Sequence, residues 1–218
     1  EGIANYREFT IKPMKALCAR LDVPLTIVAF KDTVGATLDE MLKKRKIKPC
    51  TLCGTFRRYN LNKYANGYDV IATGHNLDDE AQVVLMNILT NQLSLLPRLG
   101  PRSGTIKTKA FVPRVKPLYL VSEKEVRMYA FFQQLDIGPQ ECPYAPQSFR
   151  GQVRDWLNDY EHKHPGAKKN LINWFLRNYD RFVQSYAQES GVNTCKQCGE
   201  PSYGPICKAC SLHAEIFT

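Results

Sequence analysis

The sequence predicts an α/β fold, in which helices cover a parallel sheet, followed by a small cysteine-rich segment. The first observation is a β-branched run at residues 70–73, which leads through Gly74 into an amphipathic helical pattern that begins at Leu77. The second is a helix followed directly by a strand within residues 6–30. The third is another strand and helix after residue 115. Such repeated units are typical of parallel sheets in α/β proteins.

The first part of the chain is predicted to alternate between helix and strand. Residues 6–21 form an amphipathic helix whose apolar face includes Cys18, and we expect this thiol in the core. Residues 25–30 form a predicted strand. Thr37 and Glu40 have the spacing of a capping box, in which each side chain bonds the backbone of the other, and they start a short helix.

The middle of the chain contains two segments rich in basic residues. The basic run 43–48 ends the short helix, and such a run usually forms a solvated helix face. Residues 91–113 are rich in Pro, Gly and basic residues and have no period, which predicts a long loop of the kind that often carries function. A strand near residues 115–121 and a helix capped by Ser122 and Glu125 follow.

Two helices follow the segment 138–144, which places Cys142 at a predicted strand-to-loop junction. They span residues 148–162 and 168–187. The second helix carries an aromatic stripe, which we expect in the core rather than at a nucleotide. The stripe consists of Trp174, Phe175, Tyr179 and Phe182.

Composition indicates a globular protein with a polyanionic partner. A chain of 218 residues is long enough for one large or two small domains. Its 30 basic and 21 acidic residues give a net charge of +9, which suits a partner such as nucleic acid. No apolar run is long enough for a membrane helix and no secretory signal is present, so we expect no membrane and a cytoplasmic location.

Four cysteines near the C-terminal end form two Cys-x-x-Cys pairs eight residues apart. In a chain without export signals such pairs favour a metal over disulfides, which are the alternative. Four thiolates in this arrangement form a closed tetrahedral site that suits structural zinc. These predicted zinc ligands are Cys195, Cys198, Cys207 and Cys210.

Three further cysteines predict a site with an open position. Cys50 and Cys53 are close in sequence, whereas the fold must deliver Cys142. Three protein ligands leave one position for water on zinc, or one iron of a [4Fe-4S] cluster without a protein ligand. The alternatives are persulfides or a thiol–disulfide cycle. Arg57 and Arg58, one helical turn further on, either lower a thiolate pKa, bind phosphate or are simply solvated.

An acidic turn follows the strand at residues 70–73. Asn76 is placed to cap the helix with Asp79 as its reciprocal partner, and helix N-termini at strand ends bind phosphate. A carboxylate beside a phosphate holds Mg²⁺ or takes a proton. Asp79, preceded by Gly74, His75 and Asn76, is therefore the candidate functional carboxylate, whereas Asp78 and Glu80 suit the helix dipole.

Taken together these motifs resemble the tRNA 2-thiouridine synthetases of the TtuA and NcsA type, in the PP-loop ATP pyrophosphatase superfamily. The resemblance rests on Pro49-Cys50-x-x-Cys53-Gly54 with Arg57-Arg58, on residues 72–81, on Glu141-Cys142-Pro143-Tyr144 and on the terminal cysteines. It implies a [4Fe-4S] cluster on Cys50, Cys53 and Cys142, zinc on the four terminal cysteines, ATP with Mg²⁺ near Gly74, His75 and Asn76, and Asp79 as the catalytic acidic residue.

The resemblance also implies a reaction and partners. The family adenylates the C2 carbonyl of a tRNA uridine and then transfers sulfur to give 2-thiouridine. The partners would be tRNA, a sulfur donor that is sulfide or a ubiquitin-like thiocarboxylate protein, and a second copy of the chain in a homodimer. The ATP-binding loop of the family, Ser-Gly-Gly-x-Asp-Ser, is absent, so we expect residue 1 to follow a missing strand and loop.

The expected domains are a PP-loop catalytic domain at residues 1–146, a helical extension at 147–190 and a zinc-ribbon domain at 191–218. Two other functions remain open. A tRNA-cytidine 2-thiolase shares the three-cysteine site, although the terminal cysteines favour the uridine branch. A non-enzymatic zinc-ribbon RNA-binding module would explain the basic charge but not the three additional cysteines.

Overall fold

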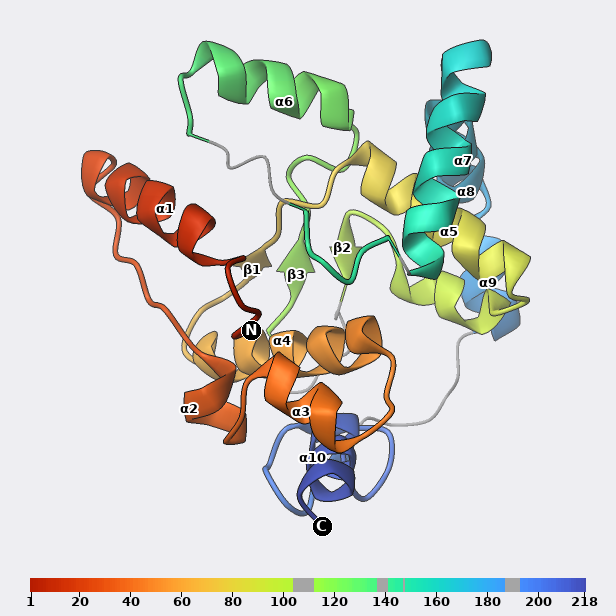
Figure 1. The fold of residues 1–218 in the computed structure, drawn as a ribbon. Coiled ribbons are helices and arrows are strands. Elements are labelled where there is room, and N and C mark those ends of the chain that lie inside the picture. Colours follow the sequence, from red (N-terminus) through yellow and green to blue (C-terminus); the bar gives the residue numbers. More distant parts are fainter. Residues whose placement is uncertain (104–111, 137–140, 147, 187–192) are drawn as a thin grey trace. The chain divides into compact units, whose positions relative to one another are not determined.

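The computed structural model describes residues 1–103, 112–136, 141–146, 148–186 and 193–218 (Figure 1). The chain divides into two compact units, each assembled from separate segments. Unit 1 comprises Glu1–Asn66, Met128–Ala145 and Val192–Thr218, and unit 2 comprises Gly67–Arg127 and Pro146–Gly191. Each unit is described by itself.

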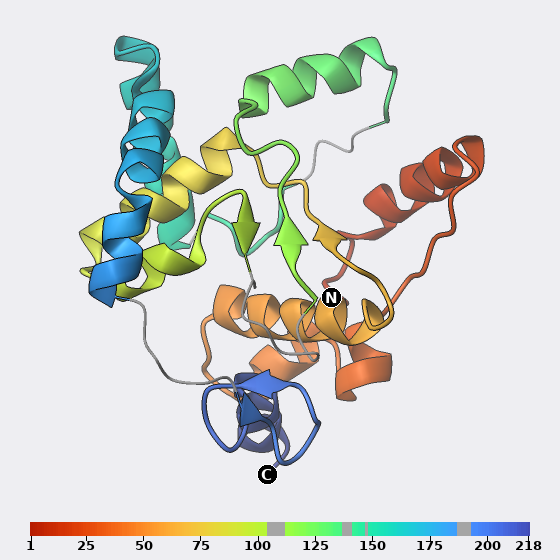
Figure 2. The same cartoon turned by 180° about the vertical axis from the view of Figure 1, so that it is seen from behind.

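Unit 1 is mainly helical and is built around α4 (Pro49–Tyr64). Helices α2 (Phe30–Val34), α3 (Leu38–Lys44) and α10 (Lys208–Phe217) all contact α4, as Figures 1 and 2 show. Helix α1 (Glu8–Arg20) and the antiparallel hairpin of β4 (Asn193–Thr194) and β5 (Pro201–Ser202) complete it. The apolar core joins the first helices to the terminal segment. Its members include Phe30, Leu38, Met41, Leu52, Phe56, Leu212 and Ile216.

Unit 2 combines a small mixed sheet with packed helices. The strands are β1 (Ile71–Ala72), β3 (Arg114–Val115) and β2 (Arg102–Ser103), in that spatial order. Strand β1 pairs with β3 in parallel, with Ile71 opposite Arg114, whereas β2 is antiparallel to β3. The unit is therefore α/β, as expected, with one parallel strand pair among its described residues.

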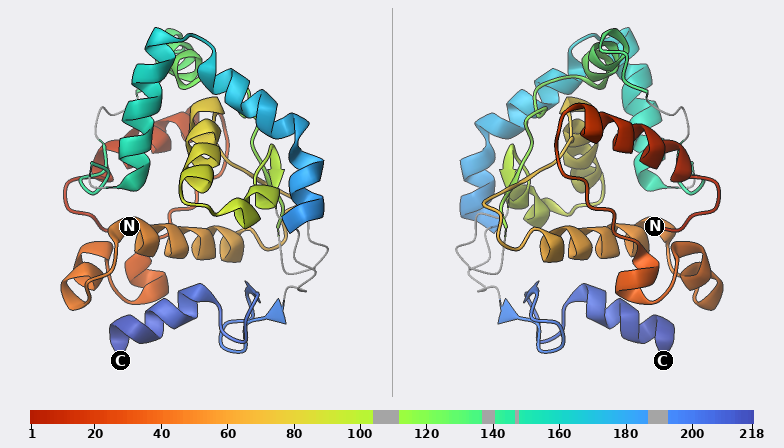
Figure 3. Two further views of the ribbon diagram at one scale, coloured as in Figure 1. Left: turned by 90° about the vertical axis from the view of Figure 1, so that its right-hand side faces the viewer. Right: turned by 90° about the vertical axis from the view of Figure 1, so that its left-hand side faces the viewer.

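The helices of unit 2 bury its core. Helix α5 (Leu77–Leu89) packs against α7 (Phe149–Lys163) and α8 (Ala167–Arg177), and α9 (Tyr179–Tyr186) packs against the 3-10 helix η1 (Leu93–Arg98) (Figure 3). The buried core residues are Leu77, Ala81, Val84, Leu96, Tyr119, Leu157, Ile172 and Phe175. The remaining helix, α6 (Glu123–Phe132), has residues in both units.

The helix starts predicted from capping residues are confirmed, because capping bonds are local. Thr37 Oγ1 accepts from the Glu40 backbone N–H at 3.2 Å, and the Glu40 carboxylate accepts from the Thr37 N–H at 2.8 Å. Ser122 and Glu125 make the same exchange at the start of α6. Helix α4 begins at Pro49, because proline suits the first position of a helix.

Two predicted strands are wrong or too long. Residues 25–29 are in neither helix nor strand, and Leu25 and Ile27 are 39% and 51% exposed. Apolar β-branched residues form a strand only where a neighbouring strand takes their backbone hydrogen bonds, and the described residues supply none here. The strand expected at 115–121 is only Arg114–Val115, since a turn at Lys116–Tyr119 ends it.

Three further expectations need correction. The expected loop 91–113 contains η1 and β2, while its residues 104–111 lie outside the described part. The helix expected at 168–187 ends at Arg177 and restarts at Tyr179, because the Asn178 side chain caps the preceding carbonyl of Trp174. Cys18 is only half-buried, and α1 buries none of its residues.

The aromatic stripe of the second helical segment divides between core and surface. Phe175 is fully buried, and Tyr179 and Phe182 pack partly buried against the same core, as predicted. Trp174 is 44% exposed, and its ring contacts Phe182 edge-on at 5.7 Å between centroids. Within the described residues, no helix combines the length and apolar character that a membrane crossing requires.

Candidate functional site

The four terminal cysteines converge on one point in unit 1. Their Sγ atoms all lie within 4.8 Å of one another. Cys195 follows β4, and Cys207 caps the N-terminus of α10. The backbone N–H of Cys207 donates to Cys195 Sγ at 3.2 Å, and that of Cys210 donates to Cys207 Sγ at 3.4 Å. Backbone donors aimed at sulfur are what thiolate ligands of a metal need.

The pKa values of these cysteines indicate when the group can carry its full negative charge. The backbone N–H of Cys207 lowers the pKa of Cys195 to about 6, whereas burial raises the pKa of Cys198 to about 11. Burial also raises the pKa of Cys210. Four neighbouring thiols therefore cannot all ionise near neutral pH unless a bound cation compensates their charge. The donor set and closeness fit Zn²⁺.

The terminal segment is held by the first helices of unit 1. Arg45 Nε donates to the Glu215 carbonyl at 2.8 Å, and Lys44 Nζ lies 4.4 Å from the centre of the Phe217 ring. The Asn62 side chain donates to the Glu200 carboxylate. The basic run at residues 43–48 is thus more than the solvated face that its composition predicts, because two of its members contact α10.

The other three candidate cysteines also lie in unit 1. Cys50 and Cys53 occupy the first turn of α4, and Cys142 lies in the irregular segment 141–146. Cys53 and Cys142 are half-buried against the same core, while Cys50 is exposed. The strand expected before Cys142 falls partly on residues 137–140, outside the described part.

Two hydrogen bonds fix the segment that carries Cys142. Tyr144 Oη donates to Asp39 Oδ1 at 2.8 Å, which ties the segment to α3. The Ala145 N–H donates to the Cys142 carbonyl at 2.8 Å and closes a turn. Cys50, Cys53 and Cys142 do not form such a close group: among the described residues, the four terminal cysteines are the one set of three or more candidate metal ligands whose atoms all lie within 4.8 Å of one another. This is compatible with a cubane, whose cysteines bind different iron atoms.

Burial, rather than the neighbouring arginine, dominates the electrostatics of Cys53. Burial raises the pKa of the Cys53 thiol, and the nearby Glu1 and Cys142 raise it further. Arg57 donates a hydrogen bond to Cys53 and opposes the rise but does not reverse it. Arg57 also lies 3.7 Å from the Glu1 carboxylate. Arg57 thus acts on the pKa of Cys53 in the direction that the sequence suggests, but burial outweighs it.

The acidic turn lies in unit 2, at the start of α5. Asn76 Oδ1 accepts from the Asp79 N–H at 3.0 Å, and Asp79 Oδ2 accepts from the Asn76 N–H at 3.1 Å. The predicted capping box is confirmed. Gly74 and His75 precede it in the exposed connection from β1, and His75 Nδ1 lies 2.9 Å from Thr73 Oγ1. Partial desolvation lowers the pKa of His75.

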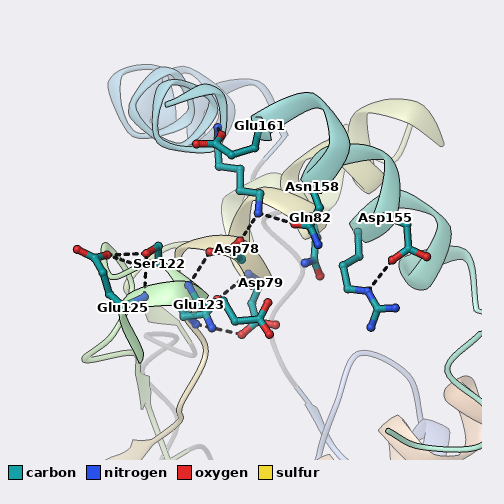
Figure 4. Close-up of polar contacts among 12 residues, drawn as sticks. Asp78, Asp79, Gln82, Ser122, Glu123, Glu125, Asp155, Asn158 and Glu161 are labelled. Carbon is teal, nitrogen blue, oxygen red and sulfur yellow. Dashed lines mark hydrogen bonds and ion pairs between the residues drawn. The ribbon is translucent and has the colours of Figure 1, made fainter. Parts of the chain in front are cut away.

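Asp78 and Glu80 are buried and paired, which separates them from Asp79. Asp78 Oδ1 accepts from Lys168, and its Oδ2 accepts from the Glu123 N–H at 2.7 Å (Figure 4). Glu80 pairs with Lys116 at 2.8 Å. The side chains of Asp78 and Glu80 are 7% and 3% exposed, against 32% for Asp79. Of the three carboxylates, Asp79 is the most accessible to a ligand.

Sequence reasoning missed the partner of Asp79. Arg150, in the first turn of α7, donates from Nη2 to Asp79 Oδ1 at 2.8 Å and from Nε to Gln82 Oε1 at 3.0 Å. Nothing in the sequence marks Arg150 except its place near the start of the helix predicted at residues 148–162. Only the packing of α7 on α5 brings it to the acidic turn.

Comparisons with known proteins bear on the same motifs. No protein-family model matches the chain. It is 39% identical over 213 residues to the tRNA-5-methyluridine(54) 2-sulfurtransferase of Pyrococcus horikoshii, covering 97% of this chain and 67% of that protein. It is 38% identical over 219 residues to the cytoplasmic tRNA 2-thiolation protein 1 of Chlamydomonas reinhardtii, covering 97% of this chain and 59% of that one.

A solved structure is similar as well. The U34-tRNA thiolase NcsA from Methanococcus maripaludis, solved with its [4Fe-4S] cluster, superposes with a TM-score of 0.78 at 35% identity. The match covers 99% of this chain and 68% of the thiolase. The chain thus spans about three fifths to two thirds of the length of these relatives. On the sequence identity and on the shared fold, the chain belongs to the family of tRNA 2-thiolation proteins that includes NcsA.

Proposed function

We propose that this protein is an ATP-dependent tRNA-uridine 2-sulfurtransferase that converts uridine to 2-thiouridine. The observation that carries the proposal is the placement of Cys53 and Cys142, 89 positions apart in sequence, against one core of unit 1, with Cys50 one helical turn from Cys53. The names of the relatives support the reaction class. The cluster in the NcsA structure supports the iron-sulfur assignment.

Cys50, Cys53 and Cys142 would hold a [4Fe-4S] cluster. When bound, such a cluster supplies an iron that lacks a protein ligand and can hold a sulfur atom for transfer. The half-buried setting of Cys53 and Cys142 fits this group, because burial shields a cluster from water while the exposed Cys50 side remains open to a substrate. The turn closed by Ala145, together with the Tyr144 bond to Asp39, would keep Cys142 in place.

The four terminal cysteines would hold a structural Zn²⁺. All four positions of a tetrahedral ion are then occupied by protein, so the ion has no place for water or substrate. Its contribution would be to fold the terminal segment against α3 and α4, where Arg45 and Asn62 already hold it.

ATP would make the uridine reactive. The C2 carbonyl oxygen attacks the α-phosphorus and pyrophosphate leaves; a sulfur nucleophile then attacks C2 and expels AMP, a better leaving group than oxide. The turn with Gly74, His75 and Asn76 would bind phosphate at the α5 N-terminus. Asp79 would hold Mg²⁺ or position the uridine. The proposal includes a PP-loop domain with a parallel sheet at residues 1–146, a helical extension at 147–190 and a zinc-ribbon domain at 191–218.

The partners would be tRNA, a sulfur donor and a second copy of the chain. The net charge of +9 supports a polyanionic substrate. The sulfur donor would be sulfide or a ubiquitin-like thiocarboxylate protein, and the assembly a homodimer in the cytoplasm, the compartment named for the algal relative.

Replacing Cys142 by alanine tests the division between the two metal sites. Protein purified without oxygen should lose iron and 2-thiouridine formation while it keeps one zinc per chain, because the zinc ligands are separate. Cys18→Ala is the matched control, since Cys18 lies in α1 and belongs to neither set. Thiolation by the Cys142 variant would refute the sulfur-transfer proposal, and iron-free wild-type protein that binds tRNA would favour an RNA-binding module.

A further inference from the structure

Each carboxylate in the first turn of α5 has a cation from a different segment. Asp78 forms an ion pair with Lys168 of α8, and Glu80 forms one with Lys116 in the turn after β3. Asp79 forms an ion pair with Arg150 of α7. The first two pairs are buried, and they join the start of α5 to α8 and to the turn after β3. The pair of Asp79 with Arg150 is different because both side chains are about one third exposed, at 32% and 39%.

The guanidinium of Arg150 makes contacts that a simple surface ion pair lacks. Its Nη2 donates to Asp79 Oδ1 at 2.8 Å and lies 3.4 Å from the Asp79 carbonyl oxygen. Its Nε donates at 3.0 Å to the side chain of Gln82, which is only 4% exposed. The guanidinium is planar and rigid. Because the buried Gln82 amide holds its Nε, its Nη2 is a donor in a fixed position for Asp79.

These contacts define the orientation of the Asp79 carboxylate. One oxygen accepts from the Asn76 backbone and the other from Arg150, so each is held by a donor from a different element. A carboxylate has about four acceptor sites. The two that remain are available to a substrate donor or a metal, in a direction set by both anchors.

We propose that Arg150 is a positioning residue, which fixes the Asp79 carboxylate for its role at the reaction centre. The role of Asp79 in this inference rests on the proposed function. The clamp, by which we mean the contacts of Arg150 with Asp79 and Gln82, rests on the geometry alone. Lysine could keep the charge but has a single nitrogen, so it could not bridge Asp79 and Gln82 as the guanidinium does. Arg150 would act through Asp79 rather than by contact with substrate.

A double-mutant cycle in thiolation kinetics tests this role. Arg150→Gln should lower kcat roughly 10- to 100-fold, the range expected when a reacting group is misplaced, with KM for tRNA changed less than about twofold. Arg150→Lys should recover only part of the loss. In an Asp79→Asn background, Arg150→Gln should cost nothing further, because the group that it positions is already lost. Multiplicative losses would overturn the proposal.

Controls separate this proposal from general damage and from failure of the proposed function. Arg127→Gln removes an exposed Arg–Glu pair on α6 and should leave kcat unchanged. Should wild-type protein form no 2-thiouridine, the proposed function fails, and the clamp is then judged by NMR. The Nε–H signal of Arg150 should be protected from exchange in wild type and lose protection in Gln82→Ala; a signal exposed in wild type would refute the clamp.

Discussion

Replacing Lys168 by methionine removes the cation of a buried ion pair in unit 2. The side chains of Lys168 and Asp78 are 10% and 7% exposed. Lys168 Nζ donates both to Asp78 and to Asn158, so it connects the start of α5 to α7 and α8. Methionine keeps an unbranched side chain of similar length, and the perturbation is therefore mainly the loss of charge and hydrogen bonds.

The expected loss follows from what remains at Asp78. Its carboxylate keeps the Glu123 N–H at 2.7 Å but has lost its counter-ion in a site away from water. Removal of one partner from a buried pair costs about 3–5 kcal/mol. For a chain of this length that corresponds to a fall of roughly 6–20 °C in the unfolding midpoint.

Lys163→Met provides a matched control on the neighbouring helix. Lys163 pairs with Asp159 at 2.8 Å, close to an ordinary ion-pair distance, but both side chains are 63% exposed. Water and salt screen such a pair, and its loss should be barely measurable. Thermal and urea unfolding followed by far-UV circular dichroism compare the two variants. Equal losses of stability would refute the argument that burial decides the effect.

Three further predictions concern the metal, the histidine and the RNA. Cys207→Ser should reduce the zinc content well below one ion per chain, whereas Cys18→Ser should leave it unchanged. Mass spectrometry of the metal measures this content, and a full zinc content in the Cys207 variant would contradict the proposed zinc site. His75 should titrate in NMR below its ordinary pKa of 6.5. As the pH falls, His75 then takes up a proton in the unfolded chain before it does so in the folded chain. The free energy of unfolding therefore decreases as the pH drops below 6.5. The logarithm of the affinity for tRNA should fall linearly with the logarithm of the salt concentration, and an affinity unaffected by salt would exclude binding through the positive charge of the chain.

Features set by neighbours in sequence could be predicted from the sequence. The capping boxes at Thr37 and Asn76 depend on a partner three residues away, so spacing alone identifies them. The terminal cysteine pairs are similar, since a short turn suffices to bring their sulfur atoms within 4.8 Å. Both capping boxes are confirmed, and the four sulfur atoms lie together as the spacing of the cysteines indicates.

Features that need a distant partner were beyond the sequence. The segment 25–30 has the residues of a strand, but a strand exists only where another strand accepts its hydrogen bonds. Arg150 and Lys168 look like ordinary helix residues until α7 and α8 pack on α5. Asp78 could likewise be assigned to the helix dipole, because its buried counter-ion lies 90 residues away.

The most direct test of the central proposal is analysis of the nucleosides of tRNA treated with the purified protein in the absence of oxygen. With ATP, Mg²⁺ and sulfide present, mass spectrometry should detect 2-thiouridine. Omission of ATP should abolish it. Formation of 2-thiocytidine instead, or of no thiolated nucleoside by protein that carries both iron and zinc, would contradict the assignment as a uridine sulfurtransferase.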